Sequence, residues 1–205
     1  MAGTRSRRSQ SGGPRPGPPD HADVPQDPQS IDAEPDPFSV AQAIVYRQLT
    51  AAPKSRLQLA RKLAERNIPE HVAEAVLDKF QEVRLINDAE FADMWVRSRS
   101  QSRKLAKGAL RRELAEKGID QETAASALEQ VTDDDEEAAA RALVERKLRP
   151  GTDVSGPGER DKAVRRLASM LARKGYQPSQ AFRIVNEVLD SRQESDSGPV
   201  QSRYP

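Results

Sequence analysis

The segment LRRELAEKGI (residues 110–119) recurs in related form at two other places, as LARKLAERNI (59–68) and as LASMLARKGY (167–176). The copies are offset by 51 and 57 residues, and each is followed by a shorter amphipathic run. Within those runs, Ala73, Ala124 and Ala181 occupy corresponding positions. Internal repeats of this length are typical of stacked supersecondary units that share a continuous core.

Each copy ends at a residue type that tolerates the left-handed backbone conformation, namely Asn67, Gly118 or Gly175. If these residues occupy the C′ position, a leucine lies at C3 and an apolar residue at C″, the two positions that touch in a Schellman cap. The pairs are Leu63 with Ile68, Leu114 with Ile119, and Leu171 with Tyr176. Three matched caps in register predict three helices that end in the same way.

A further amphipathic segment precedes each copy, at Val40–Leu49, Asp88–Arg99 and Glu136–Leu148. Charged residues make up 32% of the chain and aromatic residues only 4%, so the core must be aliphatic. We therefore predict an all-α fold of three tandem three-helix repeats, nine helices in total. Repeat 1 covers residues 38–86, repeat 2 covers 87–131, and repeat 3 covers 132–190 with a Gly/Pro-rich loop at 149–159.

The two ends of the chain differ from the repeats in composition. Residues 1–37 hold eight prolines and few apolar residues, so we predict a disordered N-terminal tail. We favour a solubilising role for this tail over a specific binding arm. Residues 191–205 are also polar and are predicted to be a flexible C-terminus.

Positive charge is concentrated between residues 97 and 119, where eight basic and two acidic residues give +6, whereas the whole chain carries only +1. A solvated helix surface is one interpretation of such a run. We favour a functional strip that contacts DNA phosphates or an acidic protein groove, because the charge has one sign and similar charge recurs in the other repeats. The strip comprises Arg97, Arg99, Arg103, Lys104, Lys107, Arg111, Arg112 and Lys117, and the secondary basic residues are Lys54, Arg56, Arg61, Lys62, Arg165, Arg166, Arg173 and Lys174.

Catalytic and cofactor sites are not indicated. The chain has no cysteine, which excludes thiolate chemistry and suits a reducing cytoplasm. His21 falls in the predicted tail and His71 in a predicted helix start, and the acidic run 133–137 suits a helix N-terminus better than a metal site. There is no phosphate-binding glycine loop, membrane-length apolar run or signal core. We expect a non-enzymatic, cytoplasmic protein without a cofactor or a metal.

Beyond these patterns, the chain resembles the RecX family, the regulators of the RecA recombinase. The resemblance covers about residues 40–189, and its most specific part is INDAEFADMWVRSRSQ (86–101) followed by KGALRRELAEKGI (107–119). It also includes LTAAPKSRLQLARKLAERNI (49–68), VLDKF (76–80) and VRRLASMLARKGY (164–176). One position departs from the family, because Arg84 stands where the family usually has glycine before the second unit.

The resemblance implies tandem three-helix repeats in an elongated, curved array. It also implies binding to the RecA monomer and to the RecA–DNA filament. Such binding would limit filament growth and so lower ATP hydrolysis, strand exchange and the coprotease activity that triggers the damage response. We expect a monomer that binds DNA, if at all, weakly and without sequence preference, because few aromatics accompany the basic residues.

Two other classes remain open from the residues alone. A repressor-like helical DNA-binding regulator would bind a defined duplex tightly without RecA. A helical-repeat adaptor for another protein would leave RecA unaffected and would bind no nucleic acid in a salt-sensitive way.

Overall fold

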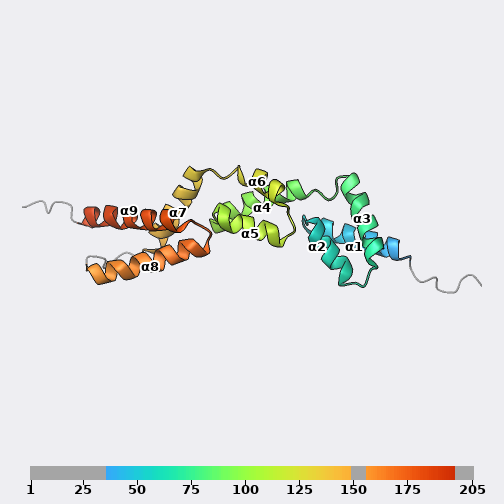
Figure 1. The fold of residues 1–205 in the computed structure, drawn as a ribbon, viewed down its shortest axis with the longest axis horizontal. Helices are drawn as coiled ribbons and strands as arrows, with labels where there is room; N and C mark the ends of the chain where they lie inside the picture. Colours follow the sequence, from blue (N-terminus) through green and yellow to red (C-terminus); the bar gives the residue numbers. More distant parts are fainter. Residues whose placement is uncertain (1–35, 149–155, 197–205) are drawn as a thin grey trace, which may run out of the picture. The chain divides into compact units, whose positions relative to one another are not determined.

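The computed structural model describes residues 36–148 and 156–196, and within these ranges the chain forms nine α-helices and no strand. The helices form three groups of three, α1–α3, α4–α6 and α7–α9 (Figure 1). This arrangement confirms the predicted all-α fold of tandem three-helix repeats. The helices are α1 (Pro37–Ala51), α2 (Arg56–Ala64), α3 (Glu70–Glu82), α4 (Asp88–Arg103), α5 (Lys107–Glu116), α6 (Gln121–Leu128), α7 (Asp133–Lys147), α8 (Pro157–Arg173) and α9 (Pro178–Asp196).

Each repeat has its own aliphatic core, and the main helix packing occurs inside the repeats. Leu63 and Leu77 are fully buried in the first core, Leu114 in the second and Leu171 in the third. Ala106 is an exception, because it precedes α5 of the second repeat but belongs to the core of the third. The third core therefore extends across the boundary between these two repeats.

The three predicted Schellman caps are present. Asn67, Gly118 and Gly175 all have positive φ, at 57°, 80° and 91°. The amide of each following residue donates to the carbonyl of the leucine at C3, at distances of 3.1–3.2 Å. These bonds join Ile68 to Leu63, Ile119 to Leu114, and Tyr176 to Leu171. The shared sequence pattern therefore corresponds to a shared backbone turn.

A fourth left-handed turn lies at Arg84, the position where the resemblance noted from the sequence leads us to expect glycine. Arg84 adopts φ 57°, and the amide of Leu85 donates to the carbonyl of Phe80 at 2.9 Å. The turn after α3 thus has the geometry that a glycine would give, although arginine has a Cβ that disfavours it. The substitution leaves the turn in place and adds conformational strain.

Several helices are longer than the sequence pattern predicts. α1 begins at Pro37, inside the predicted tail, because the Asp36 carboxylate accepts the amides of Phe38 and Ser39 and Pro37 suits the first helical position. Residues 1–35 of that predicted tail lie outside the described residues. At the other end, α9 continues to Asp196, past the predicted boundary at residue 190.

Two internal helices also extend beyond their predicted charged ends. α4 continues to Arg103. The sequence does not predict this extension, because the last turn of α4 carries no apolar residues that would show a helical period. α7 begins at Asp133, where the Thr132 hydroxyl and the Asp135 carboxylate form a capping box. The acidic run therefore lies in the first turn of α7, where the helix dipole favours carboxylates.

Candidate nucleic-acid interface

The cap of the second repeat contacts the start of α2 in the first repeat. Ser55 is the N-cap of α2 and the only fully buried polar residue in the described part of the chain. Its hydroxyl donates to the carbonyl of Lys117 at 2.7 Å. Gly118 lies so close to Leu57 that a Cβ on this glycine would be 2.6 Å from the Leu57 Cβ. A Schellman turn thus serves both as a helix end and as a contact between repeats.

A corresponding contact, in which a backbone amide takes the place of the hydroxyl, joins the second and third repeats. Ala106, the N-cap of α5, donates its amide to the carbonyl of Lys174 at 3.0 Å. A Cβ on Gly175 would lie 2.2 Å from the amide nitrogen of Ala109, so no larger residue fits. The Tyr176 hydroxyl donates to the Lys104 carbonyl at 3.1 Å, and burial raises the pKa of Tyr176 to about 12. Tyr176 therefore remains a protonated donor at neutral pH.

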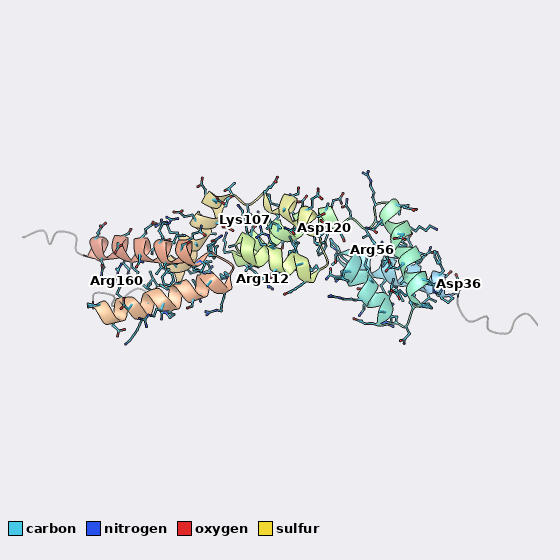
Figure 2. All side chains as sticks on the ribbon, in the orientation of Figure 1. Asp36, Arg56, Lys107, Arg112, Asp120 and Arg160 are labelled. Atoms are coloured by element: carbon cyan, nitrogen blue, oxygen red, sulfur yellow. The ribbon has the colours of Figure 1, made fainter. Side chains whose placement is uncertain are left out.

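A carboxylate from the next repeat completes each contact. Asp88 of α4 accepts the amide of Arg56 at 2.8 Å, and Glu136 of α7 accepts the amide of Lys107. Arg56 and Lys107 begin α2 and α5 (Figure 2). The carboxylates thus satisfy free amides at helix N-termini, where the helix dipole also favours negative charge. We call each set of three contacts a joint: joint 1 between repeats 1 and 2, and joint 2 between repeats 2 and 3.

The basic strip predicted at residues 97–119 is divided between two helices. Its first part is the last turns of α4, and its second part is α5. Lys104 separates them and takes the left-handed conformation, with φ 52°. That conformation places its carbonyl against Tyr176 of joint 2. The strip is therefore built around a joint and is not one continuous helix surface.

Two members of the strip surround Trp95. The Arg99 guanidinium lies 4.1 Å from the centroid of the Trp95 ring, and the Lys117 ammonium lies 4.0 Å from it. The Trp95 indole also donates to Glu113 at 2.8 Å, and Arg99 Nε lies 3.7 Å from the same carboxylate. Burial lowers the pKa of Lys117. These cations stabilise the second repeat through cation–π contacts and are less available to a partner.

The remaining strip residues are more accessible. Lys107 is half-buried and pairs with Asp133 of α7 at 2.8 Å, in addition to its amide contact at joint 2. Five strip residues make no ion pair within residues 36–148 and 156–196, and four of them are exposed. These five are Arg97, Arg103, Lys104, Arg111 and Arg112, and Lys104 is the half-buried one.

The secondary basic residues divide in the same way. Arg56 pairs with Glu74 and Asp78, and Lys62 pairs with Glu65 at 2.6 Å, so neighbouring carboxylates already neutralise both. Arg61 is exposed and donates to the Glu116 carbonyl at 3.4 Å. Within the described ranges, no ion pair engages the other five: Lys54, Arg165, Arg166, Arg173 and Lys174.

Lys174 marks a cationic cluster at joint 2. Its ammonium donates to the Arg103 carbonyl at 2.5 Å. Burial lowers the pKa of Lys174, and so do the nearby charges of Arg146, Arg103 and Lys147. Arg146 and Lys147 were not identified from the sequence, because cations in the last turn of a helix are already explained by its dipole. Their charges act on Lys174 in the folded chain, and this proximity identifies them as anion-binding candidates.

The described residues offer neither a metal site nor a membrane span. No group of three or more His, Asp or Glu side chains with metal-binding geometry occurs between 36 and 148 or between 156 and 196. In those ranges, no helix is long and apolar enough to cross a membrane. The cationic surface around the two joints is the site that the geometry supports best.

Comparison with known proteins places the repeats in a family. Residues 41–80 match the model of the first three-helix domain of RecX, and residues 87–128 match that of the second. The regulatory protein RecX of Streptomyces coelicolor is 48% identical over 159 residues, covering 78% of this chain and 82% of the relative. That of Thermobifida fusca is 45% identical over 156 residues, covering 76% and 82%.

Solved structures show the same fold. RecX from Lactobacillus salivarius aligns with a TM-score of 0.62 at 21% sequence identity, covering 75% of this chain and 97% of the other. A second RecX crystal structure also aligns with a TM-score of 0.62, at 22% identity, covering 74% and 72%. The sequence relatives show common descent, and the structures show a common arrangement of helices.

Proposed function

Because this chain belongs to the RecX family of regulatory proteins, we propose that it binds the RecA recombinase and inhibits it. The observation that carries this proposal is the match of nearly the whole helical region to regulatory RecX proteins. We propose that the chain acts by binding alone, as a cytoplasmic, monomeric and non-enzymatic regulator. Its partners would be the RecA monomer and the RecA–DNA filament.

The proposed inhibition acts on filament growth. A bound regulator that blocks addition of RecA subunits would shorten filaments, and fewer assembled subunits would hydrolyse less ATP. Strand exchange and coprotease activity would fall for the same reason, because both require the filament. This mechanism needs no chemistry from the inhibitor, and substoichiometric amounts are enough if each bound molecule stops a growing filament.

The surface that we propose for these contacts consists of the accessible cations around the joints. Arg97, Arg103, Arg111 and Arg112 are exposed and make no ion pair in the described part of the chain. Arg112 lies on α5 (Figure 2). Guanidinium groups bind phosphates and carboxylates with paired hydrogen bonds, so the surface suits a nucleic-acid backbone or an acidic protein face. Without a platform of exposed aromatic side chains among these cations, direct DNA binding should be weak and independent of sequence.

A titration of RecA tests the proposal. ATP hydrolysis by RecA on single-stranded DNA is measured while this protein is added at substoichiometric ratios. We expect hydrolysis to decline progressively, with a parallel decrease of filament length in electron micrographs. Unchanged hydrolysis, together with tight binding to a defined duplex without RecA, would instead identify a helical DNA-binding regulator. Unchanged hydrolysis without nucleic-acid binding would identify an adaptor for another protein.

A further inference from the structure

The two joints carry equivalent surface grooves with different chemistry. The groove at joint 1, of about 550 Å³, lies between the end of α1, the turn after α3 and the first turns of α4. The groove at joint 2, of about 490 Å³, lies between the end of α4, the turn after α6 and the first turns of α7, with Tyr176 at its edge. The repeat therefore produces the same groove twice.

The register of the first helices establishes the equivalence. Buried alanine and valine pairs occupy the same place in all three: Ala41 with Val45, Ala92 with Val96, and Ala140 with Val144. The joint carboxylates have the same spacing, because Asp88 and Glu136 each lie four residues before the buried alanine of their helix. In the turns before them, the buried Ile86 and Val131 each immediately precede the N-cap of the next helix, although three more residues separate Val131 from its joint carboxylate. Residues on the two sides of each groove can therefore be matched one by one.

The matched residues show that the groove at joint 1 has large apolar side chains where joint 2 has small or polar ones, although Leu49 and Tyr46 also pack against the core of the first repeat. Arg97 and Ser100 at joint 2 occupy the positions that Tyr46 and Leu49 occupy at joint 1. Likewise, Gln130 at joint 2 is equivalent to Leu85 at joint 1, and Ala142 is equivalent to Met94. Joint 2 forms corresponding contacts between repeats with these small or polar residues. Leu85 and Met94, which belong to no core cluster, are thus not explained by the contact between repeats.

These side chains are also accessible. Tyr46, Leu85 and Met94 are 54%, 48% and 38% exposed. With Val83, the C-cap of α3 and the chain neighbour of the lining residue Arg84, they make up four of the five large exposed apolar side chains in the described residues. The fifth is Phe182 on α9. An exposed apolar patch gathered in a groove is typical of a protein-docking surface.

The rim of the groove indicates the chemistry of the occupant. Lys54 and Arg84 line the α2 and α3 sides, and neither makes an ion pair within residues 36–148 and 156–196. Glu90 of α4 is the one carboxylate in the lining. The apolar lining offers no donor to a phosphate backbone, and its two aromatic rings are already packed, Tyr46 against Phe80 and Phe91 against Trp95. A protein segment fits these features better than a nucleic acid does.

We propose that the groove at joint 1 docks an amphipathic segment of a protein partner. That segment inserts a large apolar side chain between Leu85 and Met94 and places carboxylates near Lys54 and Arg84. This inference rests on the proposed function, in which the partner protein is RecA. It separates two roles along the chain: an apolar groove that recognises protein, and a cationic surface that interacts with the filament and its DNA.

The test uses the full chain carrying Leu85→Gln and Met94→Gln, with Phe182→Gln as the matched control that also removes an exposed apolar side chain. Binding to RecA without DNA is measured by fluorescence anisotropy, and binding to single-stranded DNA is measured in parallel. We expect the double variant to bind RecA at least tenfold more weakly at low and high salt, with unchanged DNA affinity and melting temperature. Phe182→Gln should bind RecA as the wild type does.

Arg84→Glu provides a second, electrostatic readout. It should weaken RecA binding at low salt, with a smaller effect at high salt where the charges are screened. RecA binding by the double variant within twofold of wild type would overturn the inference and leave the proposed function intact. A decrease of DNA affinity equal to the decrease of RecA affinity would also overturn it. So would a wild-type chain that forms dimers when the double variant stays monomeric. A wild-type chain that does not bind RecA would overturn the proposed function and this inference with it.

Discussion

Gly175→Ala should separate the third repeat from the second, although it adds only one methyl group. The added Cβ would lie 2.2 Å from the amide nitrogen of Ala109 and 2.6 Å from its Cβ. The nearest atom belongs to the backbone, so a side-chain rotation cannot relieve the contact. Asn67→Ala is the matched control, because Asn67 has the same place in the cap of the first repeat but already carries a Cβ and is exposed.

The expected magnitudes differ because the two substitutions disturb different features. Alanine in the left-handed conformation costs roughly 1–2 kcal/mol relative to glycine. Inserting a methyl group into a tightly packed contact costs about 1–3 kcal/mol more, unless the two surfaces move apart. Gly175→Ala should therefore lower the free energy of unfolding by about 2–5 kcal/mol. Asn67→Ala should lower it by about 1 kcal/mol or less, because it changes only the backbone preference.

Urea unfolding followed by two probes gives the comparison. Far-UV circular dichroism reports all helices, and fluorescence of Trp95, the only tryptophan, reports the second repeat. If the joint couples the repeats, Gly175→Ala should shift the dichroism midpoint more than the fluorescence midpoint, because the third repeat unfolds first. Equal effects of Gly175→Ala and Asn67→Ala on stability would refute the contact between the cap and α5.

Three further predictions concern the second repeat, the turn after the first and the acid stability of the third. Leu114→Ala, at a fully buried cap position, should lower the free energy of unfolding by about 2–5 kcal/mol in urea titrations. Arg84→Gly should raise the melting temperature, by relieving about 1 kcal/mol of left-handed strain, and a lower melting temperature would contradict this. Bonding to Arg183 holds the pKa of Glu137 and Glu187 below the ordinary 4.5, so these carboxylates contribute stability above that pH and lose it as pH falls further. The difference in urea midpoint between wild type and Arg183→Gln should accordingly shrink from pH 7 to pH 3.

Local sequence signals were enough to predict the caps. Asn67, Gly118 and Gly175 were identifiable because left-handed residues, preceding leucines and following apolar residues recur at fixed spacing. Helix ends without apolar residues were not, as the extension of α4 to Arg103 shows. The left-handed Lys104 had no signal either, because lysine has no preference for that conformation and tertiary bonds from the third repeat stabilise it.

The candidate site was predicted in outline but not in its division of roles. The basic run was visible as charge, yet nothing in the pattern distinguishes Arg99, which lies against Trp95, from the exposed Arg97. Arg146 joins the surface only because folding brings α7 close to Lys174. The groove at joint 1 has no signal in the sequence, because its lining residues come from separate helices that only folding brings together.

Charge removal on the accessible part of the strip tests the central claim most directly. The variant replaces Arg97, Arg103, Arg111 and Arg112 with Gln and leaves Arg99 and Lys117 in place to preserve the packing around Trp95. Inhibition of RecA ATP hydrolysis on single-stranded DNA is then compared with wild type across a range of salt concentrations. We predict markedly weaker inhibition by the variant at moderate salt, and a salt slope for DNA binding that is shallower by roughly 0.7 for each phosphate that the variant no longer neutralises. Equal inhibition by variant and wild type at every salt concentration would contradict a role for this surface.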